Sequence, residues 1–257
     1  MPAFVAALLG VVFRGVFAVL QLFRHPRPIH SRGLVLIGEV RRTRAAVPSG
    51  IAWIDGLDTA TADGAGIPHS DIPGDSLAVR ARVSRSVGLP SWLPDVIGLA
   101  LRVDIGGTPA DIELSSSGTG VPGRFLLAPR WSAAGGTFNT LLPYRGSRGP
   151  VLVSARSVEP DTLPANLAAL RRELAARPWR VTLAFATPAG PWHPFADVIL
   201  RAAPDQDDTD LRFDAVRRSL PGAGWYRWIR VLRQPSYRLV QDGATGVRRR
   251  RSGPPGR

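Results

Sequence analysis

The chain has 257 residues, 44% of them hydrophobic, and a formal net charge of +13 at pH 7. It contains no cysteine, which excludes disulfides, thiolate metal sites, iron–sulfur clusters and cysteine nucleophiles. Only four histidines are present, so a histidine-rich metal cluster is not expected. The positive charge comes from arginine alone and favours anionic partners such as phospholipid headgroups, acidic ligands or nucleic acid.

The first 24 residues form an apolar segment. Between Pro2 and Phe23 the only polar side chains are Arg14 and Gln21, which predicts an apolar N-terminal helix at 1–24. It lacks the positive start and small-residue cleavage site of a secretory signal. A central arginine costs about 2.5 to 3.5 kcal/mol on insertion scales, so the segment is a poor transmembrane span. Two interpretations stay open: a helix packed on the domain, or peripheral membrane contact through residues 2–23.

From Gly33 onward, short runs of Val, Ile and Leu alternate with Gly and Pro clusters, a pattern typical of strands and turns. Leucines spaced three and four apart predict a helix at 163–176. The predicted strands are 35–41, 76–83, 98–105, 124–127, 137–143, 151–157 and 181–186. Many short strands with few helices favour an α+β, mainly β fold, an antiparallel β-barrel with flanking helices.

The remaining segments complete the domain organisation. Residues 53–75 are rich in Gly, Asp and Thr and predict a loop. Residues 243–257, which include four consecutive arginines at 248–251, predict a disordered basic tail. The globular domain is therefore expected at 25–242.

Three local motifs could carry chemistry. In the heptapeptide at 27–33, Arg-Pro-Ile-His-Ser-Arg-Gly, the arginines favour the neutral imidazole that a general base needs, although a single histidine is more often structural. Arg80, Arg82 and Ser84 share one face of a strand, which either points inward toward anionic partners or faces solvent. Arg233 precedes Tyr237 by one helical turn and could stabilise its phenolate, or the pair is surface packing.

Together these motifs resemble the haem catalase family. The family's Arg-x-x-His-(Ala/Ser)-(Arg/Lys)-Gly motif is matched at 27–33, and its Arg-x-Ser strand at 82–84. An Asp-x-x-Gly-(Phe/Leu)-Ala-x-(Lys/Arg) segment is similar to 95–102. The C-terminal order of an apolar-Phe-Asp segment, Pro-Gly and Arg-x-x-x-Tyr is similar to 211–214, 221–222 and 233–237. The similarity covers about 25–240 in a chain much shorter than an ordinary catalase, so it resembles a truncated, minimal member.

The resemblance implies a catalase-like haem-binding domain at 25–242 that holds haem b and its iron. The site residues that it implies are His30 and Ser84 in catalysis, Tyr237 as the iron ligand, and Arg27, Arg82, Phe125 and Arg233 around the haem. It implies peroxidase or catalase-like chemistry on hydrogen peroxide or on organic hydroperoxides, including those of lipids.

Two departures from the family narrow this expectation. The segment at 111–116 ends in serines where the family has a distal asparagine that orients peroxide, and no aspartate follows the Tyr237 motif. Without the asparagine a fast two-peroxide cycle is not expected, so peroxidase activity is the prediction.

Three other classes of protein share some of these sequence features. A non-catalytic, membrane-associated protein of the same fold with a degenerate haem site would share every apolar pattern. A phosphodiesterase-type hydrolase would need clustered His and Asp, and the sequence has no His-Asp pair or His-x-His. No helix-turn-helix or RNA motif accompanies the terminal arginines, so no specific nucleic acid is expected. The default location is the cytoplasm, with membrane association as the alternative, and the oligomeric state is open.

Overall fold

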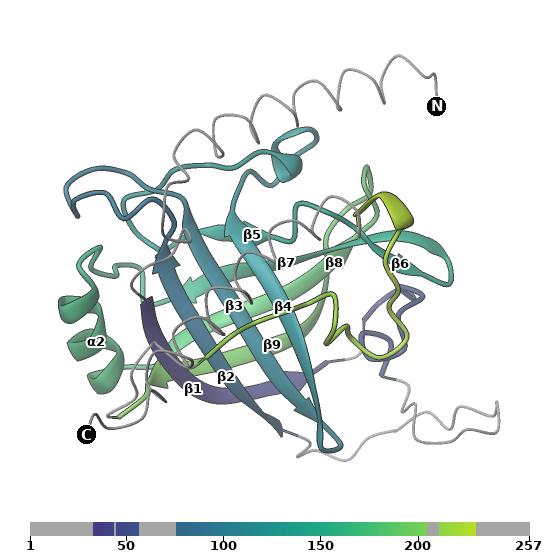
Figure 1. Cartoon of the computed structure of the whole chain (residues 1–257), viewed down its shortest axis with the longest axis horizontal. Coiled ribbons are helices and arrows are strands. Elements are labelled where there is room, and N and C mark those ends of the chain that lie inside the picture. Colours follow the sequence, from purple (N-terminus) through teal and green to yellow (C-terminus); the bar gives the residue numbers. More distant parts are fainter. Residues whose placement is uncertain (1–32, 44, 57–75, 205–210, 230–257) are drawn as a thin grey trace, which may run out of the picture.

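The computed structural model describes residues 33–43, 45–56, 76–204 and 211–229, which form one antiparallel barrel with an α-helix beside it (Figure 1). The elements are β1 (Gly33–Arg42), β2 (Ser76–Arg85), β3 (Ile97–Ile105), β4 (Thr108–Ser116), the 3-10 helix η1 (Gly123–Phe125), β5 (Thr137–Asn139), β6 (Tyr144–Gly146), β7 (Gly149–Glu159), α2 (Leu167–Ala176), β8 (Trp179–Ala186) and β9 (His193–Ala202).

The barrel closes through two pairings between strands that are distant in the sequence. Strands β1 to β5 pair in chain order, β7 to β9 do the same, and β1 pairs with β9. The short strand β5 also pairs with β7, which completes a ring of eight antiparallel strands. The predicted mainly β, antiparallel barrel is therefore confirmed.

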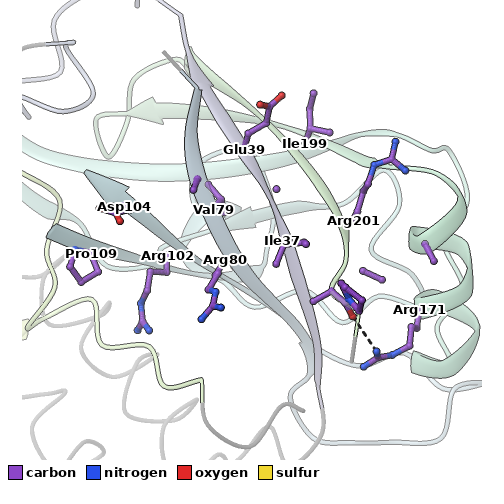
Figure 2. Close-up of a pocket in the computed structure, with 16 residues that line it drawn as sticks. Ile37, Glu39, Val79, Arg80, Arg102, Asp104, Pro109, Arg171, Ile199 and Arg201 are labelled. Atoms are coloured by element: carbon purple, nitrogen blue, oxygen red, sulfur yellow. Dashed lines mark hydrogen bonds between the residues drawn. The ribbon is translucent and has the colours of Figure 1, made fainter. Parts of the chain in front are cut away.

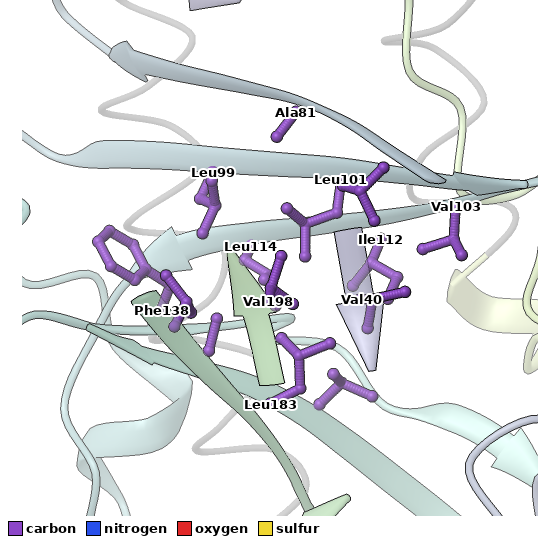
Figure 3. Packing of buried hydrophobic residues seen from close by; sticks show 14 of the residues in the cluster. Val40, Ala81, Leu99, Leu101, Val103, Ile112, Leu114, Phe138, Leu183 and Val198 are labelled. Atoms are coloured by element: carbon purple, nitrogen blue, oxygen red, sulfur yellow. The ribbon is translucent and has the colours of Figure 1, made fainter. Parts of the chain in front are cut away.

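The interior of the barrel is packed with aliphatic and aromatic side chains (Figure 3). Alternation along the strands sends one face inward: Ile112 and Leu114 of β4 are 0% and 3% exposed, while Glu113 between them faces outward. Phe138 of β5 packs edge-on against Trp179 of β8 with ring centroids 6.1 Å apart. The resemblance would place haem in a porphyrin-sized cavity of the barrel, but side chains fill the interior of the described strands, so a ligand of that size has to lie outside them.

Many of the local predictions are confirmed, whereas the predicted N-terminal helix at 1–24 and basic tail at 243–257 lie outside the described residues. Strands form at 35–41, 76–83, 98–105, 151–157 and 181–186, each extended by one or more residues. The helix begins later than expected, because the side chain of Asn166 caps it by accepting hydrogen bonds from the amides of Ala168 (3.0 Å) and Ala169 (3.1 Å). The predicted loop at 53–75 is described only to Gly56, and its first residue, Trp53, is 1% exposed in the core.

Other predictions of local structure are wrong. Residues 124–127 do not form a strand, because η1 occupies Gly123–Phe125 and buries Arg124. Strand β5 ends at Asn139, short of the expected 143, and Leu141 just beyond has φ of 58°, a left-handed conformation that no strand continues through.

Strands β4, β6 and β9 were not predicted. The β3–β4 turn is Gly106-Gly107, both with positive φ, which is a hairpin signal that the sequence does carry. Strand β9 contains Pro194, which cannot donate to a ladder, and the β8–β9 pairing shifts register beside it between Leu183 and Ala184.

Candidate functional site

The outer face of β1 to β4 carries the residues that the sequence singled out. The strand register aligns three rows across this face. The Ser84 row is Gly33, Ser84, Gly98 and Ser115; the Arg82 row is Val35, Arg82, Ala100 and Glu113; the Arg80 row is Ile37, Arg80, Arg102 and Asp111. Because Val79, Ala81 and Val83 of β2 belong to the core, the alternating residues of β2 point out of the barrel.

Arg82, Ser84 and Gly33 meet at the rim where β1 begins and β2 ends. Gly33 is paired with Ser84. A Cβ added to Gly33 would lie 2.7 Å from Cζ and 2.8 Å from Nε of Arg82, so the guanidinium lies directly against the β1 backbone and would have to move if Gly33 carried a side chain. Ser84 is 3% exposed and Arg82 is partly buried. The structure thus joins the last residue of the 27–33 motif to the Arg-x-Ser element, which faces outward and is shielded from water.

Of the other predicted site residues, the structure describes one. Phe125 is partly buried in η1. His30 and Arg27, together with Arg233 and Tyr237, lie outside the described residues.

Arg124 holds η1 in place. Its Nη1 donates to the carbonyls of Thr187 (3.0 Å) and Gly190 (2.9 Å) in the β8–β9 turn, and its guanidinium stacks over the ring of Trp192 at 4.7 Å. Burial lowers the pKa of this guanidinium. The contacts are structural, and they fix the position of the neighbouring Phe125.

Sequence reasoning missed Asn139, which continues the Ser84 row onto β5 opposite Ser115. Its side chain is fully buried, and Nδ2 donates to the carbonyls of Gly118 (2.9 Å) and Arg124 (3.4 Å). Within the described ranges, its Oδ1 has no hydrogen-bond partner. No local signal points to this residue, because only the pairing of β5 with β4 brings it to the row.

A basic groove of about 1130 Å³ runs along the Arg80 row and on to β9 and α2 (Figure 2). Arg80, Arg102, Arg171 and Arg201 line it, against the acidic Glu39 and Asp104. Arg102 is neutralised by Asp111, whose carboxylate accepts from Nε at 2.6 Å and Nη2 at 2.8 Å. Because more arginines than carboxylates line the groove, its net charge is positive and suits it to anionic groups.

Three further findings bear on the site. Among the residues that the structure describes, no three His, Cys, Asp or Glu side chains come together as a metal-binding group. No helix in the same part of the chain is both long and apolar enough to cross a bilayer. Comparison with known protein families gives no match, and comparison with curated proteins gives none either.

Proposed function

We propose that the protein is a catalase-like, haem-dependent peroxidase that acts on hydrogen peroxide or on organic hydroperoxides, including those of lipids. The observation that carries the proposal is the contact between two motifs that the sequence separates by about fifty residues. Gly33, which ends the motif containing His30, lies opposite Ser84 and against the guanidinium of Arg82. The antiparallel pairing of β1 with β2 therefore brings the end of one motif and the whole of the other to the same rim.

The described residues fit a planar, dianionic group on the outer face. The packed interior excludes the ring from the barrel itself. Gly33 and Gly98 in the Ser84 row, with Ala100 in the next row, have minimal side chains on β1 and β3, on either side of β2. The guanidinium of Arg82 lies against Gly33 and would offer a charge-assisted hydrogen bond to a propionate.

Each residue of the proposed site has a separate task. The haem, when bound, would supply the redox chemistry that cleaves the peroxide bond. His30 would take the proton from the bound peroxide and return it to the departing oxygen. Ser84 would fix the orientation of that imidazole, because the residue opposite it in the strand register is only three positions from His30. On the far face Tyr237 would ligate iron, with Arg233 keeping the phenolate ionised.

The surroundings of the haem complete the proposal. Arg27 would pair with a propionate as Arg82 does, and Phe125 would face the ring. The end of β4 supports peroxidase rather than catalase chemistry. Ser116 accepts a hydrogen bond from the amide of Ile97 (3.0 Å) and donates to the carbonyl of Ala128 (2.7 Å), so its hydroxyl is occupied in joining β4 to β3 and to the loop after η1. It is not free to position a second peroxide.

Absorption spectra of the full chain, expressed with haem supply, test the proposal. The wild type should show a ferric Soret band of the tyrosinate type, which Tyr237→Phe should abolish or shift. Tyr226→Phe, a change at a partly exposed tyrosine outside the proposed site, should leave the band unchanged. His30→Ala should retain haem and lose reactivity toward peroxide. An unaltered spectrum in Tyr237→Phe would show that the ligand is wrong.

A non-catalytic protein of the same fold is the second candidate, favoured by the serines at the end of β4 in place of an amide side chain. In that case the haem site is degenerate and the protein acts as a binding module at the membrane. Reconstitution with haem separates the two: no Soret band in the folded wild-type protein would favour this candidate over the peroxidase.

A further inference from the structure

Two loops next to the Ser84 row carry large apolar side chains into solvent. Trp92 is 73% and Trp131 62% exposed, and Val87 and Leu89 are 56% and 38% exposed. The indole Nε1 of Trp131 donates to the carbonyl of Trp92 at 3.2 Å, and the backbones of Asp95 and Arg130 form a bridge beside them. We call these four apolar residues the Trp92 patch; Val87, Leu89 and Trp92 lie on the loop that projects between β2 and β3 (Figure 1), and Trp131 lies on the segment between η1 and β5.

The loop beneath the patch satisfies its backbone from within. The buried carboxylate of Asp95 accepts from the amides of Val87 (3.0 Å), Gly88 (2.9 Å) and Leu89 (3.1 Å). Arg85 donates to the carbonyls of Pro90 (3.2 Å) and Leu93 (2.5 Å). Backbone groups that already have partners lose little when water leaves, so these groups can lie against the headgroup layer of a membrane at low cost.

The rim with this patch is also where the chain enters the barrel. Gly33 pairs with Ser84, and the loop of the patch begins directly after β2 ends at Arg85. The sequence before Gly33 contains the apolar stretch 2–23 and then Arg24, Arg27 and Arg32, and the first acidic residue of the chain is Glu39. An apolar and a basic segment thus lead into the same rim as the exposed indoles.

We infer that the Trp92 patch is a contact surface for an anionic phospholipid bilayer. Tryptophan combines a large apolar ring with a polar edge and is enriched where membrane meets water. The protein's net charge of +13 and the arginines before Gly33 complement anionic headgroups. Apolar side chains on a projecting, internally bonded loop fit a soft, deformable surface. This inference does not depend on haem.

Co-flotation of the full-length protein with vesicles tests the inference. Vesicles of equal parts phosphatidylcholine and phosphatidylserine should bind the wild type, more weakly as salt rises, and pure phosphatidylcholine vesicles should bind it less. The double variant Trp92→Ser, Trp131→Ser should lower the affinity about tenfold or more, because two large rings no longer leave water. Trp228→Ser, at a residue that is 55% exposed in the helical segment 227–229, is the matched control and should bind as the wild type does.

Two further measurements make the result decisive. Circular dichroism and thermal unfolding should show that the double variant folds, and Trp92→Phe, Trp131→Phe should retain most of the vesicle affinity. Unchanged binding by the Ser variant would overturn the inference, because the contact would then lie elsewhere. The inference would also be overturned if the wild-type protein did not bind vesicles but formed an oligomer that the Ser variant no longer forms. The patch would then be a protein interface.

Discussion

Replacing Gly38 by alanine should open the barrel at the seam between β1 and β9. Gly38 lies within β1 opposite Leu200. An added Cβ would lie 1.8 Å from the carbonyl oxygen of Ile199, 2.9 Å from its carbonyl carbon and 3.1 Å from Cα of Leu200. These are backbone atoms, which cannot rotate away, so the two strands have to separate. An overpacking cost of about 1–3 kcal/mol and the weakening of one or two ladder hydrogen bonds, each worth about 1 kcal/mol, give about 2–5 kcal/mol.

Urea unfolding followed by tryptophan fluorescence measures this cost. A typical domain has only about 5–15 kcal/mol of stability, so the Gly38→Ala midpoint should fall markedly. Gly120→Ala is the control, because nothing lies within 4 Å of the Cβ that it adds, and its free energy of unfolding should change by less than about 0.5 kcal/mol. A loss below about 1 kcal/mol in Gly38→Ala would refute the close approach of β1 and β9.

Three more substitutions test the packing and the rim. Asp111→Ala should cost about 3–5 kcal/mol in the same urea assay, because it leaves the guanidinium of Arg102 without its buried carboxylate; a loss below about 1 kcal/mol would contradict that role. Leu101→Ala should cost about 2–5 kcal/mol, seen as a lower melting temperature, since Leu101 is 1% exposed inside the barrel, and an unchanged melting temperature would argue against the packed interior. Gly33→Ala should change stability by less than about 1 kcal/mol, because the flexible side chain of Arg82 can move, yet weaken haem binding in an absorbance titration; equal haem affinity would remove Arg82 from the proposed site.

Features that depend on neighbours along the chain were predictable. Apolar alternation identifies β2 and β3, and leucine spacing identifies α2, because both patterns follow from the repeat of a single element. The same reasoning did not identify β9, which contains a proline, or η1, which contains a buried arginine. In both cases the deciding contacts, the shifted β8–β9 register and the bonds of Arg124 to the β8–β9 turn, come from other elements.

Some features of the candidate site could likewise be predicted from the sequence, and others could not. The sequence shows Arg82 and Ser84 and their spacing. It does not show whether their side chains face the core or the outside, because the residues of both faces of a strand repeat with the same period of two. Asp111 shows the limit most clearly: it is fully buried, and its carboxylate accepts from the amide of Asp214, a residue 103 positions away. No local pattern encodes such a partner.

The sequence by itself determined that this chain builds short antiparallel strands around an apolar interior, and it marked the residues at 82–84 as unusual. The tertiary structure alone decided that β5 closes the ring onto β7, that Gly33 lies against Arg82, and that Trp92 and Trp131 meet at the same rim. The reason is physical: strand periodicity is a property of neighbouring residues, whereas closure and register come from contacts between distant segments, whose partners are selected only when the whole core packs.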